Sequence, residues 1–178
     1  MSDTESLGLK RGEVVVVRYD PRWRVLFERA AEELLSLLGP SVLAVHHVGS
    51  TAVPGLCAKP ILDVLVSIPN FADATKLVPA LASAGYVFRP DEEIPDRHYF
   101  RRGPDAARTH HLSLAEPTSR HHRVSVEFRD ALRRGAQLAT AYADLKLDLA
   151  RRFPFDRTAY IEGKSDFIAE ALGKTDLS

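Results

Sequence analysis

A chain of 178 residues with 45% hydrophobic and 27% charged residues can bury one sizeable core, and this composition excludes a disordered or fibrous protein. Lysine plus arginine and aspartate plus glutamate number 24 each, so the net charge gives no bulk attraction to nucleic acid or to a membrane surface. Any anion-binding site must therefore be local.

The predicted elements start after a polar segment at residues 1–12, for which we expect mobility. Four valines at 14–17 fit a short strand or an extended lead-in to the first helix. Asp20 is a suitable N-cap for that helix, with Pro21 at the first helical position. Apolar residues then recur at helical spacing until Gly39, which is predicted to end the helix.

Five short runs rich in β-branched and aromatic residues are bounded by glycine, proline or polar clusters, as strands are. They cover residues 42–48, 61–68, 86–89, 98–102 and 110–116. Between the second and third runs, Asn70 can cap a helix that Gly85 ends. The polar residues 90–96 are predicted to form a loop.

After residue 119 the apolar spacing becomes helical. The segment VSVEF at 124–128 could pass for a strand, but its neighbours favour a helix that Gly135 ends. Two more helices are predicted, at 136–153 and at 156–173.

This order of elements predicts one α/β or α+β domain over residues 13–175. We expect a mixed β-sheet flanked by helices, followed by a helical C-terminal part. The single cysteine, Cys57, excludes an intramolecular disulfide. The chain shows neither a signal-peptide pattern nor an apolar run near the ~18 residues that span a bilayer, so we expect a cytoplasmic protein.

The segment VGSTAVPGLCAKPILDVLV at 48–66 joins the first two predicted strands and carries the chemistry. Gly49 and Ser50 follow a strand directly, where glycine lets the backbone approach a ligand and neighbouring N–H groups can point at an anion. A helix starting after Ser50 would add partial positive charge. Lys59 can add a full charge, so Gly49, Ser50, Thr51 and Lys59 are candidate phosphate ligands.

Asp63 falls in the second strand, within a run of otherwise apolar residues. A buried carboxylate is costly unless it is paired or binds a cation. Magnesium is commonly held by one or two carboxylates together with substrate phosphates. Two interpretations stay open: Asp63 is a metal ligand, or it is a structural carboxylate paired with Lys59 or an arginine.

Two tyrosine and lysine pairs repeat one helical spacing in the C-terminal part. Tyr142 shares a helix face with Lys146, and Tyr160 shares one with Lys164. We expect both tyrosines to be mostly core residues. Of the two lysines, Lys146 is the better candidate to face a cleft.

Other polar residues are weaker candidates. Arg97, Arg101 and Arg129 can reach phosphates, although arginines on a surface are usually just solvated. The adjacent residues His46 and His47 alternate across a strand, so one of the two is predicted to point outward.

The central segment resembles the signature of the GrpB-like family, whose members carry HxGSTAVPGL followed by AKPIIDI. The likeness continues in the family's order to the end of the chain. The further matching segments are RYDPRW at 18–23, HYFRRG at 98–103, THHLSL at 109–114, VEFRDALRR at 126–134, AYADLKLDLARRF at 141–153 and AYIEGKSDFI at 159–168. GrpB-like proteins are similar to the nucleotidyltransferase superfamily with the polymerase β type of fold, and some are fused to dephospho-CoA kinase.

In that superfamily a Gly-Ser pair cradles the triphosphate, and two carboxylates spaced Asp-x-Asp or Asp-x-Glu hold divalent metal. Gly49 and Ser50 match the first element, and Asp63 matches the first carboxylate. Strand periodicity places the second carboxylate at position 65, which is leucine.

A third acid is usual on a later strand, where this chain offers His111 and Ser113. One aspartate cannot hold the two ions that two-metal catalysis uses, so the resemblance leaves two outcomes open.

In the first outcome, the chain binds a nucleoside triphosphate with Mg²⁺ or Mn²⁺ and transfers a nucleotidyl or phosphoryl group to a small-molecule acceptor. Asp63 would hold the metal, aided by His47 or His111, and Lys59 would stabilise charge on the phosphates. In the second outcome, the cleft only binds a nucleotide or phosphorylated metabolite, as a non-catalytic module linked to coenzyme A biosynthesis. Nucleic acid and membranes are expected partners in neither.

Overall fold

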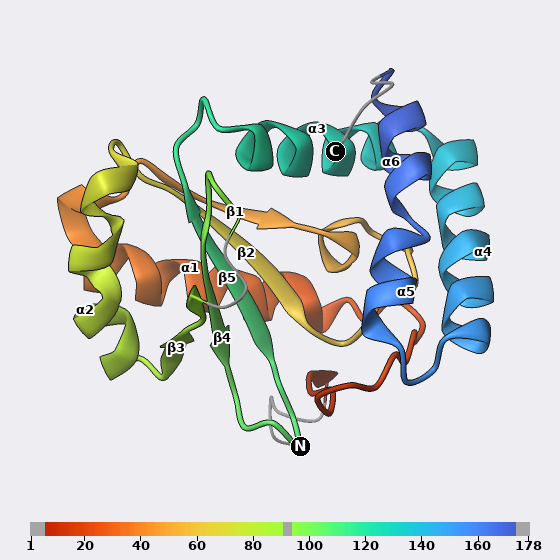
Figure 1. Cartoon of the computed structure of the whole chain (residues 1–178), viewed down its shortest axis with the longest axis horizontal. Helices are drawn as coiled ribbons and strands as arrows, with labels where there is room; N and C mark the ends of the chain where they lie inside the picture. The colour runs from red at the N-terminus through yellow and green to blue at the C-terminus, as the bar shows by residue number, and fades with distance from the viewer. Residues whose placement is uncertain (1–5, 91–93, 174–178) are drawn as a thin grey trace.

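The computed structural model describes residues 6–90 and 94–173, and its centre is a five-stranded mixed β-sheet (Figure 1). In spatial order the strands are β1 (Ala44–Val48), β2 (Leu62–Ser67), β5 (His110–Ala115), β4 (His98–Arg102) and β3 (Tyr86–Phe88). Strands β2 and β5 are parallel, and the other neighbouring pairs are antiparallel. All five predicted strands are therefore confirmed, with ends that shift by up to two residues.

Helices and short 3₁₀ turns connect and cover these strands. The helices are α1 (Arg22–Leu38), α2 (Val78–Ser83), α3 (Arg120–Arg134), α4 (Ala136–Arg152), α5 (Arg157–Glu162) and α6 (Ser165–Ala171). The 3₁₀ turns are η2 (Gly39–Ser41), η3 (Ser50–Ala52) and η4 (Phe71–Leu77). Helices α4, α5 and α6, drawn in blue, stand together at one end of the molecule, and α2 lies at the other (Figure 1). The predicted fold class, with its helical C-terminal part, is confirmed.

The two faces of the sheet have different roles. Val64 of β2 points to the face covered by α1 and α2, where it joins the main core with Trp23 and Leu112. Asp63 and Leu65, one residue to either side, point to the opposite face, as strand alternation requires. We call this second surface the cavity face.

Three predicted elements differ from the structure. The valines at 14–17 form no strand, and only Val17 pairs, through an isolated bridge to Ala58. Asn70 caps its segment as predicted, but the segment is a 3₁₀ turn followed by the short α2, which starts next to a proline. The C-terminal helix predicted at 156–173 is broken into α5 and α6 at Gly163.

Gly163, at this break, also allows two helices to pack closely. A side-chain carbon at this position would lie 2.6 Å from Cδ2 of Leu149, so the glycine allows α5 to approach α4 closely. Such a contact between distant residues leaves no mark on the local apolar spacing.

Residues 6–12, for which polar composition predicts mobility, pair with the body of the domain, while residues 1–5 lie outside the described part of the chain. The N–H of Gly8 donates to the carbonyl of Pro60, and Leu9 bridges to Arg108. None of the helices in the described residues combines the length and apolarity that crossing a membrane requires.

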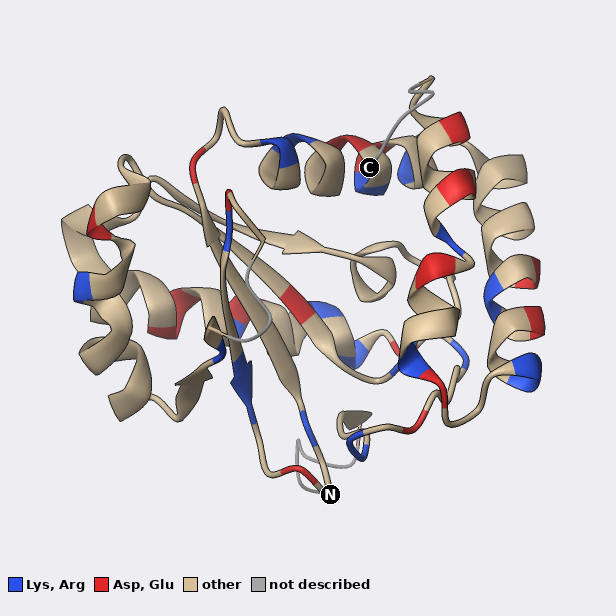
Figure 2. Ribbon diagram, in the orientation of Figure 1, with Lys and Arg blue, Asp and Glu red and all other residues tan. Residues whose placement is uncertain are grey.

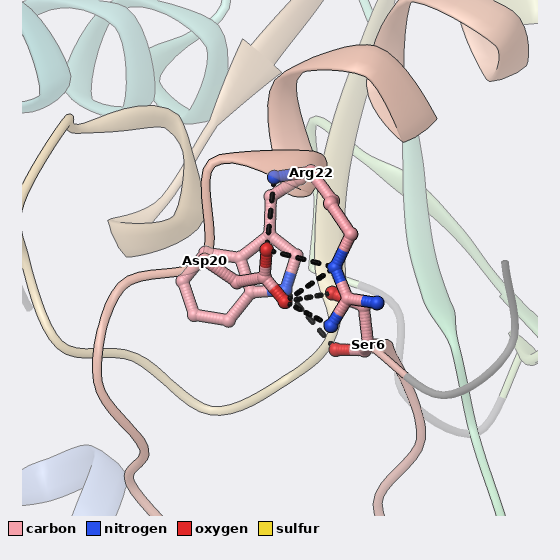
Figure 3. A network of polar contacts seen from close by, with 4 residues as sticks. Ser6, Asp20 and Arg22 are labelled. Atoms are coloured by element: carbon pink, nitrogen blue, oxygen red, sulfur yellow. Dashed lines mark hydrogen bonds and ion pairs between the residues drawn. The ribbon is translucent and has the colours of Figure 1, made fainter. Parts of the chain in front are cut away.

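Asp20 ties this N-terminal segment to the start of α1 (Figure 3). Its carboxylate accepts hydrogen bonds from the Ser6 hydroxyl at 2.6 Å and from the backbone N–H of Arg22 at 2.9 Å. The Trp23 indole donates to the Ser6 carbonyl at 3.1 Å. The structure places Pro21 at the N-cap position, so the predicted N-cap at Asp20 is wrong by one residue, but the Asp20 carboxylate still accepts from the N–H of Arg22, the first helical residue.

We expect Asp20→Ala to lower the free energy of unfolding by about 1 kcal/mol, the usual effect of losing a helix cap. Hydrogen bonds from Arg22, opposed by burial, hold the pKa of Asp20 below its usual 3.8. Because the folded pKa is depressed, the ionised carboxylate stabilises the fold above pH 4, and this contribution is lost as the pH falls further. Urea denaturation at pH 7 and pH 3 checks this. An Asp20→Ala variant as stable as wild type at pH 7 would contradict it, and Asp20→Asn, which keeps an acceptor, is the control.

Candidate functional site

The turn after β1 lies directly against the carboxylate of β2. Gly49 adopts φ +70° and ψ −173°, a conformation that is essentially restricted to glycine. Strand pairing places Val48 opposite Asp63. A side-chain carbon on Gly49 would lie only 2.4 Å from Oδ2 of Asp63, so backbone and carboxylate are packed together.

The helix expected after Ser50 is one 3₁₀ turn of three residues, η3. Such a short element has little macrodipole, so the condition for a helix-dipole contribution is not met. The first N–H groups of a helical turn have no partner within the turn, and those of Ser50 and Thr51 occupy that position.

A cavity of about 320 Å³ opens between η3, the cavity face of the sheet and helices α3, α5 and α6. Its volume is in the range of small-molecule sites. The lining includes Gly49, the η3 residues Ser50 and Thr51, and Ser113 of β5. The Gly-Ser turn and Asp63 therefore share one cavity, as the sequence predicts.

The cavity is rich in positive charge. Its charged lining residues among those described are Lys59, Asp63, Arg97, Arg129, Arg157 and Lys164. Five side chains that carry a full positive charge in their protonated form thus line the cavity with a single carboxylate, and one of the five, Arg129, also pairs at 2.8 Å with Asp130, which lies outside the lining. These cations come from the segments before β2 and β4, from α3, from the start of α5 and from the junction of α5 and α6, and Figure 2 shows lysines and arginines in blue on several separate elements. An overall neutral chain therefore has a local site suited to a polyanion.

Asp63 is oriented by His111. Oδ1 of Asp63 lies 3.1 Å from Nδ1 of His111, and the two side chains are 41% and 11% exposed. Burial raises the pKa of the carboxyl, but the hydrogen bond from His111 and the surrounding positive charges outweigh it, so the pKa is lowered. Burial lowers the pKa of His111 below 6.5. At pH 7 the imidazole is therefore neutral, and its Nδ1–H donates to an ionised Asp63.

Two lysines lie over the ring of Tyr160. Nζ of Lys59 is 5.2 Å from the ring centre, and Nζ of Lys164 is 4.4 Å from it. Burial disfavours both ammonium groups and lowers the pKa of Lys59 to about 8 and that of Lys164 to about 7. The ring stabilises cations held in a partly desolvated place.

Lys146 is not among the residues that line the cavity. Its ammonium donates to the carbonyl of Cys57 and lies 4.9 Å from the ring centre of Tyr142. The expectation that Lys146 rather than Lys164 faces the cleft is therefore wrong. Both lysines have the same spacing to a tyrosine, so the sequence offers no signal that separates them.

Two other candidates lie outside the cavity lining. His47 points to the α1 face of the sheet, where its ring stacks on Phe27 at 4.5 Å and its Nε2 lies 2.9 Å from the Thr51 hydroxyl. Arg101 is buried and lies over the ring of Tyr99 at 5.7 Å. His47 thus supports the turn rather than a ligand, which contradicts its expected place in the cleft.

Arginines of α3 brace the turn. Nη1 of Arg129 donates to the His47 carbonyl at 3.0 Å, and Nη2 of Arg133 donates to the Ala52 carbonyl at 2.7 Å. Arg129 also lines the cavity, as does Arg97, which lies over the ring of Tyr99 at 4.6 Å. Sequence reasoning missed Arg133 and Arg157, and it ranked Lys164 below Lys146.

A pair of metal ions does not fit this site. Leu65, at the position of the second carboxylate, is fully buried against Val48, Ala115 and Val126. Within residues 6–90 and 94–173, no three His, Cys, Asp or Glu side chains converge as metal ligands. One Mg²⁺ bound by Asp63 and ligand phosphates does fit, because this carboxylate is ionised and open to the cavity.

Comparison with known proteins gives a consistent family. The family model described as GrpB protein matches residues 13–174. A UPF0157 protein of Halalkalibacterium halodurans is 38% identical over 163 residues, which cover 92% of this chain and 83% of that protein. A dephospho-CoA kinase of Mycolicibacterium paratuberculosis is 30% identical over 92% of this chain, which spans 46% of the kinase.

Two solved structures extend the comparison. The crystal structure of GrpB from Enterococcus faecalis has a TM-score of 0.80 at 33% identity, covering 89% of this chain and 98% of that one. The poly(U) polymerase Cid1 has a TM-score of 0.50 at 12% identity, covering 77% of this chain and 43% of that one. At such low identity the second likeness shows the fold alone, which is nucleotidyltransferase-like.

Proposed function

This chain belongs to the GrpB family and has a nucleotidyltransferase-like fold, and from this premise we propose that its cavity binds a nucleoside triphosphate and transfers a nucleotidyl or phosphoryl group to a small-molecule acceptor. The observation that carries the proposal is the surplus of positive charge around one carboxylate, beside a glycine-containing turn. A triphosphate is the small ligand whose charge best matches that surplus.

The turn and the lysines have separate roles in this proposal. The N–H groups at the start of η3 would donate to phosphate oxygens, since glycine lets a ligand come close to the backbone. Lys59 and Lys164 would neutralise the phosphates from the other side of the cavity. Stacking on Tyr160 restricts where both ammonium groups can lie.

Asp63 would hold one Mg²⁺ or Mn²⁺ together with the ligand's phosphates, and the ion would supply charge stabilisation there. In the transfer step, the hydroxyl oxygen of the acceptor forms a bond to phosphorus. The bond from that phosphorus to the oxygen of the leaving pyrophosphate or nucleoside diphosphate breaks, and the hydroxyl proton passes to solvent. The lysines stabilise the charge on the leaving phosphates.

A second candidate function is a binding module without catalysis. Leu65 favours this function, because the buried leucine occupies the position at which a two-metal site has its second carboxylate. The dephospho-CoA kinase that matches this chain makes a precursor or product of coenzyme A synthesis a reasonable ligand.

We expect the purified chain to release pyrophosphate or nucleoside diphosphate from one of ATP, GTP, CTP or UTP when Mg²⁺ or Mn²⁺ and a pool of small metabolites are supplied. Radiolabelled nucleotides and chromatography of the products measure this. A Lys76→Met variant is the control and is expected to keep the wild-type activity, because Lys76 is exposed, pairs with Asp73 and does not line the cavity. Binding without turnover would support the module, and absence of binding in calorimetry would overturn both functions.

A further inference from the structure

Lys164 lies at the break between α5 and α6, and this position brings it into the cavity. Gly163 ends α5, and the N–H of Lys164 donates to the carbonyl of Ile161 at 3.1 Å. A continuous helix over this segment would place the following residues differently. The break thus positions a cation from the C-terminal part of the chain next to the strand that carries Asp63.

Lys164 is surrounded mostly by like charge. The groups that act on it are Lys59, Lys146 and Arg157, which repel its ammonium, and Asp63, which attracts it. The two lysines lie over one tyrosine ring, beside a single carboxylate. Without a ligand, the repulsion between their charges makes this arrangement unfavourable. An arrangement of this kind is expected where binding of an anion offsets the repulsion.

Two-metal catalysis needs a second carboxylate for its second ion. Here Leu65, which packs against Val126 of α3, stands in that position, so the place for the second ion is missing. Protein cations can supply the missing positive charge to phosphate oxygens. Lys59 comes from the loop before β2 and Lys164 from the helical part, so together they reach a ligand from two elements.

Building on the proposed function, we propose that Lys59 and Lys164 form a polyphosphate-binding pair that takes the place of the second metal ion. The pair holds the triphosphate group of the ligand, and this binding does not require a divalent ion. Mg²⁺ at Asp63 then serves the transfer step alone.

Calorimetry of the whole chain tests the pair with two probes, ATP and inorganic tripolyphosphate, each in EDTA and in Mg²⁺. We expect wild type to bind in EDTA, and Lys164→Met to bind about 10- to 100-fold more weakly, the loss for one charge-assisted contact. Lys164→Arg keeps the charge and is expected to recover most of the affinity. Tighter binding of ATP than of tripolyphosphate identifies a nucleotide as the ligand, and equal binding identifies the polyphosphate group alone.

A second readout separates binding from a structural role. Because Lys164 is repelled by its neighbours, we expect the ligand-free Lys164→Met variant to have a Tm equal to or above that of wild type. Lys146→Met is the matched comparison, since it removes a buried lysine that also lies over a tyrosine but is outside the cavity. It is expected to lower the Tm, because the carbonyl of Cys57 loses the hydrogen bond from the Lys146 ammonium, and to leave the affinity in EDTA unchanged, because Lys146 does not line the cavity.

The possible failures are distinguishable. Binding that requires Mg²⁺ and is unaffected by Lys164→Met overturns the lysine pair while the proposed function stands. Weaker binding with a lower Tm in Lys164→Met and no recovery in Lys164→Arg shows a structural lysine and also overturns the pair. Absence of binding in both EDTA and Mg²⁺ overturns the proposed function itself.

Discussion

Replacing Asp63 by asparagine is expected to lower the rate of group transfer by on the order of 100- to 1000-fold, the range found when one electrostatic contact to a reacting group is lost. Asparagine has nearly the same shape, so it still fits against Gly49 and can accept from Nδ1 of His111. The substitution removes the negative charge of Asp63, which is the only carboxylate among the described residues that line the cavity.

Measurements of affinity and rate together identify the cause. If Asp63 binds the metal, Asp63→Asn loses the effect of Mg²⁺ on the rate, while tripolyphosphate in EDTA binds as tightly as before or more tightly because a repelling charge is gone. Ser113→Ala is the control, since this residue lines the same cavity without charge. A variant that keeps a tenth or more of the wild-type rate would show that the carboxylate has no such role.

The core of the site could be predicted because its parts are close in sequence and lie on paired strands. Gly49 directly follows β1 and Asp63 is the second residue of β2, and the antiparallel pair, in which Val48 lies opposite Asp63, brings these positions together. Alternation along β2 also predicts that residue 65 shares the face of Asp63. The structure adds the reason why no acid stands there, since α3 covers that part of the face.

The cations from the C-terminal part could not be predicted in the same way. Lys164 and Arg157 reach the cavity because α5 packs against α4 and α6 packs against α3, and local spacing does not encode that packing. The spacing treats Lys146 and Lys164 alike, yet only the second follows a helix break. Gly163, at this break, also packs closely against Leu149 of α4, and local spacing does not encode that contact either.

The same limit applies to the fold. The strands and long helices follow from periodicity and caps, as the agreement for α1 and α3 shows. Residues 6–12 look mobile by composition, but they gain order from partners in distant loops, such as Pro60 and Arg108. Such tertiary hydrogen bonds outweigh the tendency of a polar segment to stay mobile.

Gly49→Ala is the substitution with the largest expected effect on stability. The backbone at φ +70° and ψ −173° costs a non-glycine residue about 1 to 3 kcal/mol. The new methyl group would also lie 2.4 Å from Oδ2 and 3.0 Å from Cβ of Asp63, so turning the carboxylate alone does not remove the overlap. Crowding of this kind adds about 1 to 3 kcal/mol.

We therefore expect a loss of roughly 2 to 6 kcal/mol in the free energy of unfolding, together with loss of phosphate binding, because Asp63 and the turn must move apart. Gly55→Ala is the matched control. Gly55 also has a positive φ, +79°, but a side-chain carbon there has no atom within 4 Å, so only the backbone term of about 1 to 2 kcal/mol applies. Denaturation of both variants in urea measures the difference. Equal losses would show that the contact between the turn and the Asp63 carboxylate contributes nothing to stability. The turn and the carboxylate would then not lie close enough to bind one ligand together.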